Sequence, residues 1–485
     1  MKFTHEQVGK AQVDDMPIRS DGPTRPNTVG FEVLHSWTDD LPVCRYSGVG
    51  LSTNQIYRED GYRQEDHEFE DRSFHFQLDD QTFLYGVFDG HDGIQAATFA
   101  LQRTAAEILL GQLSGKTSDE EIKDVLRHTF FAVERGYFDS IDDKLAERTN
   151  LQLEIPQGLS SYEAYQKYPE LVNKLKMLNN DISSGTTAVV ALVYRGKLYV
   201  ANVGDSRALL CKTDEKGVLR VTQLTVDHGL DNEDELLRLS QLGLDVTKIC
   251  HGSRLGNQEN TRCLGNYLVK GGYKEFEELA CAISEPVIAD PEINGGIPLD
   301  ENSRFLLLMS DGLYKSLEEA TKTEHVNIDI AQITVEQFRT QATLSGVAQA
   351  VVDKIVRQHH DMFVGGGNCS QRDDITLMVR NFNFPMPNAL PNSPVALPAV
   401  VFNPIVQRIT YQAIDSSSTM PESTLSSNNS YLQTCSSSET NDSSSGRYSS
   451  GTNSQARIKA YVDFSSYYAS VGNESDQNSN GSLQS

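Results

Sequence analysis

Short apolar segments of strand length recur between residues 31 and 382. Each is rich in β-branched or aromatic residues and is bounded by Gly, Asp or Lys, a pattern typical of β-strands. Those within 186–213 follow one another closely and are predicted to be consecutive antiparallel strands. The predicted strands are residues 83–89, 186–194, 198–205, 206–213, 305–311 and 374–382.

Amphipathic segments with helical periodicity separate these strands. In residues 93–113, Ile94, Ala97, Leu101 and Ile108 recur on one face, which predicts a helix. Because strands and helices come in blocks and do not alternate strictly, we expect an α+β fold with antiparallel sheets. Further helices are predicted in residues 234–245 and 347–359, and an additional helical excursion in 141–180.

Charge excludes several classes of function. The chain has 42 basic and 67 acidic residues, a formal charge of −25. It therefore repels phosphate backbones and anionic lipid, and suits divalent cations or basic protein partners. The strongest apolar run, 305–309, is far too short to span a bilayer. With no visible secretory signal and seven scattered cysteines, we expect a protein of the cytoplasm or also the nucleus, with no membrane insertion and no nucleic acid.

Composition changes sharply near residue 383, where proline-punctuated and then Ser/Asn-rich sequence begins. Such sequence cannot bury enough apolar surface to offset the entropy of ordering the chain. We therefore expect a flexible N-terminus (1–30), one domain (31–382), a disordered linker (383–455), a short motif (456–472) and a disordered end (473–485).

The short motif carries an aromatic stripe. Tyr461, Phe464, Tyr468 and Val471 recur at i, i+3, i+7 and i+10. A short isolated helix is marginal in water, so the stripe predicts a helix that folds in the groove of a partner. The alternative is that it docks on its own domain or stays disordered. The candidate partner-binding residues are Tyr461, Val462, Asp463, Phe464, Tyr467 and Tyr468.

Aspartates stand at the ends of three predicted strands, as Asp89-Gly90, Asp311-Gly312 and Asp373-Asp374. Mg²⁺ and Mn²⁺ prefer oxygen ligands, and a glycine lets a backbone carbonyl approach as one of them. Two such ions can activate a water for attack on a phosphate ester. Asp-Gly is also the commonest hairpin turn, so each pair alone could be only a turn.

Several motifs, in this order, resemble the metal-dependent serine/threonine phosphatases of type 2C. The resemblance covers residues 31–382, and implies a sandwich of two antiparallel β-sheets flanked by pairs of α-helices. The matching segments are FDGHDG (88–93), SSGTTAVVALV (183–193), ANVGDSRALL (201–210), LTVDHGLDNEDELLRL (224–239), TRCLGNY (261–267), LLLMSDGLYKSL (306–317) and RDDITLMVR (372–380).

The resemblance implies roles for individual residues. Asp89 would bridge two Mg²⁺ or Mn²⁺ ions and the Gly90 carbonyl would bind one of them. Asp311 and Asp373 would complete the core of the site. Asp205 would assist a third, weaker metal, and His91 would protonate the leaving oxygen.

One family motif departs from its usual form. The family has an early R-x-x-x-E-D, whose arginine grips the phosphate and whose acidic pair completes the metal site. Here Arg58-Glu59-Asp60 has no spacer and Arg63-Gln64-Glu65-Asp66 has one residue. Arg58 is the candidate catalytic arginine and Asp60 the candidate ligand, the alternative being a charged solvated loop. Asn266 also stands where the family usually has aspartate.

Segments 36–55, 226–245, 312–320 and 461–464 resemble a pseudophosphatase branch of this family. The resemblance to this branch implies that the protein binds and activates a TGF-β-activated MAP kinase kinase kinase through a C-terminal motif. It also allows other MAP kinase pathway proteins as partners. The first hypothesis is therefore a regulatory adaptor whose phosphatase-like domain is a scaffold. The second is an active Mg²⁺- or Mn²⁺-dependent serine/threonine phosphatase.

Overall fold

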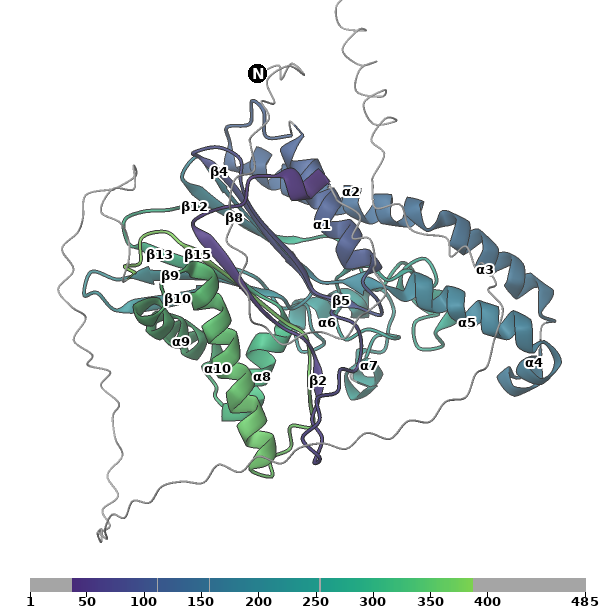
Figure 1. Cartoon of the computed structure of the whole chain (residues 1–485). Coiled ribbons are helices and arrows are strands. Elements are labelled where there is room, and N and C mark those ends of the chain that lie inside the picture. Colours follow the sequence, from purple (N-terminus) through teal and green to yellow (C-terminus); the bar gives the residue numbers. More distant parts are fainter. Residues whose placement is uncertain (1–36, 111, 157, 253, 387–485) are drawn as a thin grey trace, which may run out of the picture.

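Two five-stranded antiparallel sheets lie face to face in the computed structural model of the protein, which describes residues 37–386 except 111, 157 and 253 (Figure 1). The first sheet has the order β12 (Glu292–Pro298), β8 (Lys197–Val203), β7 (Ala188–Tyr194), β4 (Thr82–Phe88) and β3 (Arg72–Gln77). The second has the order β1 (Ser47–Ser52), β15 (Ile375–Asn381), β13 (Ser303–Met309), β9 (Arg207–Thr213) and β10 (Leu219–Gln223).

Short strands join segments at one end of the sandwich. They are β5 (Gly90–His91), β6 (Gly185–Thr186) and β11 (Leu264–Gly265) in one group, and β2 (Gln55–Ile56) with β14 (Gln371–Arg372) in another.

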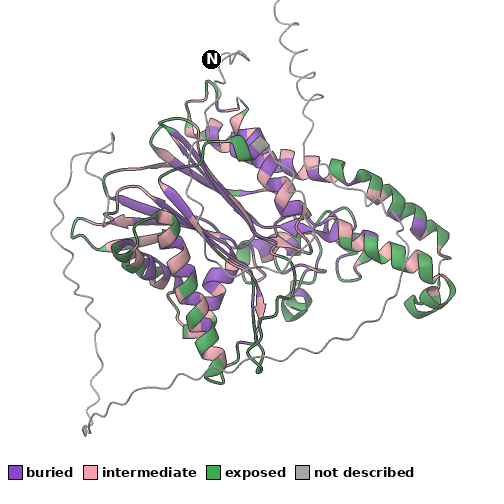
Figure 2. Ribbon diagram, viewed as in Figure 1, coloured by how far each residue is buried: buried purple, intermediate pink, exposed green. Residues whose placement is uncertain are grey.

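Helices cover both outer faces, giving four layers (Figure 1). Against the first sheet lie α1 (Gln95–Leu109) and α2 (Asp119–Ser140). Against the second lie α8 (Asp311–Thr321), α9 (Val326–Thr340) and α10 (Leu344–Val364). Between the sheets is a largely apolar core in which β4 and β7 face β9, β13 and β15, and these strands are mostly buried (Figure 2). Val87, Val189 and Leu308 are fully buried there, and the Arg380 guanidinium donates to the hydroxyl of the buried Tyr85. This arrangement confirms the predicted fold class, with three helices instead of a pair on the second sheet.

The helical excursion predicted in 141–180 is present as α3 (Asp142–Glu154), α4 (Ser161–Lys167) and α5 (Pro169–Ser183). The helices α3 and α5 run side by side away from the sandwich (Figure 1). Ion pairs from Lys144 to Asp181 (2.7 Å) and from Lys174 to Glu147 (2.6 Å) join them. The remaining elements are α6 (Glu233–Gln241), α7 (Val246–Gly252), and the 3₁₀ turns Trp37–Asp40, Tyr267–Val269 and Tyr273–Glu275.

Two boundaries differ from the sequence expectation. The segments 198–205 and 206–213 are not neighbours, because the chain crosses from β8 in the first sheet to β9 in the second through Gly204, whose φ is +88°. The packed domain also continues past 382, since Phe384 is buried against Phe338 with ring centroids 4.8 Å apart. Within the described residues, no helix combines the length and apolarity needed to cross a bilayer.

The strand β1 packs directly on α10. A Cβ atom added to Gly50 would lie 2.5 Å from the backbone carbonyl carbon of Ala348, and backbone cannot move aside cheaply. We expect Gly50→Ala to lower the free energy of unfolding by about 1–3 kcal/mol, as overpacking does. Urea denaturation measures this. Gly252→Ala is the matched control, because outside its own helix and chain neighbours no atom lies within 4 Å of its added Cβ; equal stability of the two variants would contradict the prediction.

Candidate metal centre

The antiparallel registers bring the predicted aspartates to one end of the sandwich. Met309 of β13 pairs with Leu377 of β15, so Asp311, just after β13, lies beside Asp373, just before β15. The backbone N–H of Asp311 lies 3.3 Å from Oδ2 of Asp89, which follows β4. Asp89, Asp311 and Asp373 therefore come together from both sheets.

Asp205 joins this end through the crossover between the sheets. It lies between β8 and β9, and the first residue of β9, Arg207, pairs with Met309 at the end of β13. Its carboxylate accepts hydrogen bonds from Asn260 Nδ2 (2.9 Å) and from Lys315 Nζ (3.0 Å).

Two acidic residues that the sequence analysis did not assign complete the cluster. Arg72 of β3 pairs with Phe88 of β4, so Glu70 and Asp71, just before β3, lie beside Asp89. Asp71 Oδ2 accepts from Ser310 Oγ at 2.8 Å, which ties it to the segment that precedes Asp311. A sequence signal for this placement exists, because RSFHFQ (72–77) alternates apolar and polar residues as a strand does. A strand there, followed by a turn to 83–89, would place the residues before it beside Asp89.

Asp374 holds the cluster together and does not take part as a free ligand. Its Oδ1 accepts from the backbone N–H of Asn54 (2.6 Å) and its Oδ2 from that of Glu70 (2.8 Å). The neighbouring Asp373 side chain is 57% exposed. Asp374 therefore fixes the loop around Asn54 and Glu70, while Asp373 faces the opening of the site.

Arg58 and Asp60 are not brought to this cluster. They follow β2 and pair with each other, with Arg58 Nε 3.0 Å from Asp60 Oδ1 and both side chains more than 40% exposed. Asp60 also accepts from the backbone N–H of Tyr62. Arg58 and Asp60 close a charged, solvated turn, so neither side chain reaches the cluster. The acidic pair beside Asp89 is Glu70-Asp71.

Counting back along the sequence from Glu70-Asp71 gives the position of the arginine that the family resemblance implies. Four residues before Glu70 stands Asp66, whose backbone N–H bonds Asn54 Oδ1 at 2.8 Å. The arginines beside the cluster do not replace it. Arg72 donates to the carbonyls of Phe69 and Asp71, and Arg372 donates to those of Thr53 and Asp373.

Crowding of buried carboxylates shifts their protonation. Burial raises the pKa of Asp71 to about 8, of Glu70 to about 7 and, with the charge of Asp205, of Asp311 to about 7. Burial and the charge of Asp311 also raise the pKa of Asp89. In addition, the buried Oδ1 of Asp71 has no hydrogen-bond partner.

This donor set fits Mg²⁺ or Mn²⁺, which prefer oxygen ligands and would neutralise the repulsion. Asp89, the Gly90 carbonyl, Asp311, Asp373 and Glu70 would hold such ions. Gly90 lies so close to the chain at Glu70 that a Cβ would be 2.6 Å from the Glu70 carbonyl oxygen. Bound there, a divalent ion supplies an acidified water that can act as a nucleophile.

His91, the predicted proton donor, lies in β5 at the inner side of the cluster. Burial lowers the pKa of His91 to about 4, so its imidazole is neutral at pH 7. Its Nε2 is 3.3 Å from Nδ2 of Asn266, an amide that carries no charge to stabilise a protonated ring. Asn266 has a φ of +58°, a conformation that asparagine tolerates better than most residues. The proton-donating role of His91 remains a prediction.

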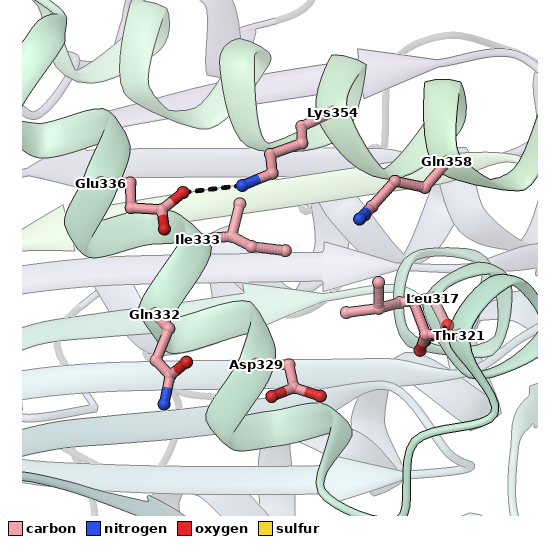
Figure 3. A pocket seen from close by; sticks show the side chains of 8 residues that line it. All are labelled: Leu317, Thr321, Asp329, Gln332, Ile333, Glu336, Lys354 and Gln358. Carbon is pink, nitrogen blue, oxygen red and sulfur yellow. Dashed lines mark hydrogen bonds and ion pairs between the residues drawn. The ribbon is translucent and has the colours of Figure 1, made fainter. Parts of the chain in front are cut away.

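Away from the cluster, a small groove of about 190 Å³ lies between α8, α9 and α10 (Figure 3). Lys354 and Glu336 form an ion pair of 2.7 Å at its wall. Its volume is below that of ordinary ligand pockets, and it adjoins Leu317 and Thr321, at the opposite end of α8 from Asp311. We therefore do not regard it as the functional site. The predicted motif residues Tyr461, Val462, Asp463, Phe464, Tyr467 and Tyr468 lie outside the described residues.

The chain is similar to several known proteins. The family model "Protein phosphatase 2C" matches residues 112–360. Probable protein phosphatase 2C 2 of Paramecium tetraurelia is 28% identical over 274 residues, which are 56% of this chain and 76% of that protein. The protein named TGF-beta-activated kinase 1 and MAP3K7-binding protein 1 of Caenorhabditis elegans is 26% identical over 284 residues, 58% of this chain and 65% of that protein. The solved serine-threonine phosphatase 2C of Toxoplasma gondii has a TM-score of 0.42 at 19% identity, over 71% of this chain and 98% of that chain.

Without metal, the stability of the domain should fall as the pH rises from 5 to 8. Asp71, Glu70 and Asp311 have raised pKa values of about 8, 7 and 7 when folded, whereas carboxyls in an unfolded chain ionise near pH 4. The folded state therefore binds more protons in this window, so the free energy of unfolding decreases with pH. Calorimetric Tm values measured with a chelator at pH 5.5, 7 and 8 test this. Asp71→Asn should flatten the slope, and Mn²⁺ should restore the Tm at pH 8; a Tm that rises over this range would contradict it.

Replacing the neutral partner of His91 should raise its pKa. In Asn266→Asp, a carboxylate near Nε2 would favour the imidazolium, and the pKa of His91 should rise from about 4 by at least one unit. Titration of the His91 ring signals by NMR measures the change. Asn260→Asp, which alters an amide bonded to Asp205 instead, is the control. An unchanged His91 titration in Asn266→Asp would show that the two side chains do not interact.

Proposed function

Since this chain belongs to the protein phosphatase 2C family, we propose that it is a regulatory member of that family. Its phosphatase-like domain serves as a scaffold, and its C-terminal motif binds and activates a TGF-β-activated MAP kinase kinase kinase. The single observation that carries this proposal is Asp66, a carboxylate four residues before Glu70, at the position where the family has its phosphate-gripping arginine.

The effect of this exchange is electrostatic. A charge-assisted hydrogen bond from arginine to phosphate contributes about 1.5–3 kcal/mol, and Asp66 replaces it with a negative charge. Arg72 and Arg372, the two arginines beside the carboxylate cluster, have their guanidinium groups engaged by backbone carbonyls. A phosphorylated substrate would therefore meet a carboxylate at position 66 in place of the arginine that the family uses to bind phosphate.

The kinase partner is supported by two independent features. One is the similarity to the Caenorhabditis elegans protein whose name describes binding to TGF-beta-activated kinase 1 and MAP3K7. The other is the aromatic stripe of residues 456–472, separated from the domain by a linker. A helical stripe on a tethered segment suits a groove on a partner protein.

A second candidate function is an active Mg²⁺- or Mn²⁺-dependent phosphoserine/threonine phosphatase. The observation that favours it is the retained carboxylate cluster of Asp89, Asp311, Asp373 and Glu70. Relatives in Paramecium tetraurelia and Arabidopsis thaliana are named as probable phosphatases. The two functions can coexist in one chain, because the cluster and the motif are separate segments.

Removal of the motif tests the adaptor function. We expect a chain lacking residues 456–485 to lose binding to the TGF-β-activated kinase in a pull-down with purified proteins, whereas a chain lacking only 473–485 keeps it. The point variant Phe464→Ala should weaken binding at least tenfold, because an anchoring aromatic side chain is lost. Unchanged binding after the larger deletion would refute the proposed role of the motif.

Restoring the arginine tests whether Asp66 weakens the binding of phosphorylated substrates. We expect Asp66→Arg to tighten binding of a phosphoserine peptide, in the presence of Mn²⁺, by about tenfold or more, as a new charge-assisted hydrogen bond would. Asp66→Ala is the matched control and should gain less. Isothermal titration with the peptide measures both. If the unaltered chain already binds and hydrolyses the peptide rapidly, and Asp373→Asn removes that turnover, the phosphatase hypothesis is favoured instead.

A further inference from the structure

Lys315 places a positive charge inside the acidic cluster. It lies one turn after Asp311 in α8, and its Nζ contacts Asp311 Oδ2 and, at 3.0 Å, Asp205 Oδ2. These two carboxylates come from different parts of the fold, the start of α8 and the crossover between the sheets. A single ammonium group therefore joins them.

The surroundings hold this contact in place. The other carboxylate oxygen of Asp205 accepts from Asn260 Nδ2 at 2.9 Å, and the backbone carbonyl of Asp205 accepts from Tyr314 Oη at 3.2 Å. Both side-chain oxygens of Asp205 are thus engaged. A lysine ammonium is protonated at neutral pH, so Lys315 brings a full positive charge to these two carboxylates.

We propose that Lys315 is a built-in cation that takes the place of a divalent ion between Asp205 and Asp311, and so restricts metal binding in this domain to the side of the cluster formed by Asp89, Glu70 and Asp373. The ammonium satisfies Asp205 and competes with any ion for one oxygen of Asp311. Unlike a metal ion, it has no coordinated water whose pKa it could lower.

This inference differs from the expectation drawn from the family resemblance, in which Asp205 assists a third metal. It also goes beyond the adaptor function, because it concerns cation binding alone and does not depend on whether the protein binds a kinase. Its test therefore uses Mn²⁺ as the probe and needs neither a kinase nor a phosphorylated substrate.

The full chain is titrated with Mn²⁺. Binding is measured by calorimetry and by the electron paramagnetic resonance signal of free Mn²⁺. Lys315→Ala and Lys315→Asp should bind one more Mn²⁺ than the unaltered chain, or bind it about tenfold more tightly or better. Lys315→Arg, which keeps the charge, should behave as the unaltered chain does. Lys354→Ala, which removes a lysine of α10 that forms an ion pair with Glu336 of α9 away from the cluster, is the matched control.

Identical Mn²⁺ isotherms for Lys315→Ala, Lys315→Asp and the unaltered chain would overturn the proposal. Should the Lys315 variants fail to fold, as judged by circular dichroism, Asp205→Asn in the otherwise unaltered chain decides the question. Weaker Mn²⁺ binding in Asp205→Asn would show that Asp205 is a metal ligand despite Lys315, and would overturn the proposal. An isotherm like that of the unaltered chain would support it.

Discussion

Mutual repulsion of carboxylates at one end of the sandwich is the constraint around which the rest of this structure is organised. Strand registers in both sheets force Asp89, Asp311 and Asp71 together in a buried setting. The fold relieves the repulsion in three ways: backbone N–H groups bind Asp374, the ammonium of Lys315 joins Asp205 to Asp311, and raised pKa values let some acids keep their protons. Divalent ions would provide a fourth.

Local sequence patterns predicted much of this architecture. The strand ends could be recognised because apolar runs stop abruptly at Asp89 and before Asp311, and another begins just after Asp373-Asp374. The antiparallel sheets then bring those ends together. The acidic pair before β3 was missed, because several Glu-Asp pairs occur within 58–71 and only the pairing of β3 with β4 distinguishes Glu70-Asp71 from the others.

Long-range placements were beyond the reach of local patterns. Nothing in 198–213 indicates that the chain leaves one sheet and enters the other at Gly204, yet this crossing is what positions Asp205. Likewise, Lys315 reads as an ordinary surface lysine on a helix until Asp205 is brought opposite to it.

The paired helices α3 and α5 have a practical consequence for studying this protein. They project from the sandwich and are fastened to each other by Lys144–Asp181 and Lys174–Glu147, so the short helix α4 at their tip is spaced well away from the acidic end. Exposed tips of this kind tolerate insertions. A fluorophore or affinity tag placed within Ser161–Lys167 would thus serve as a reporter handle on the domain, leaving both the carboxylates and the C-terminal motif untouched for binding measurements.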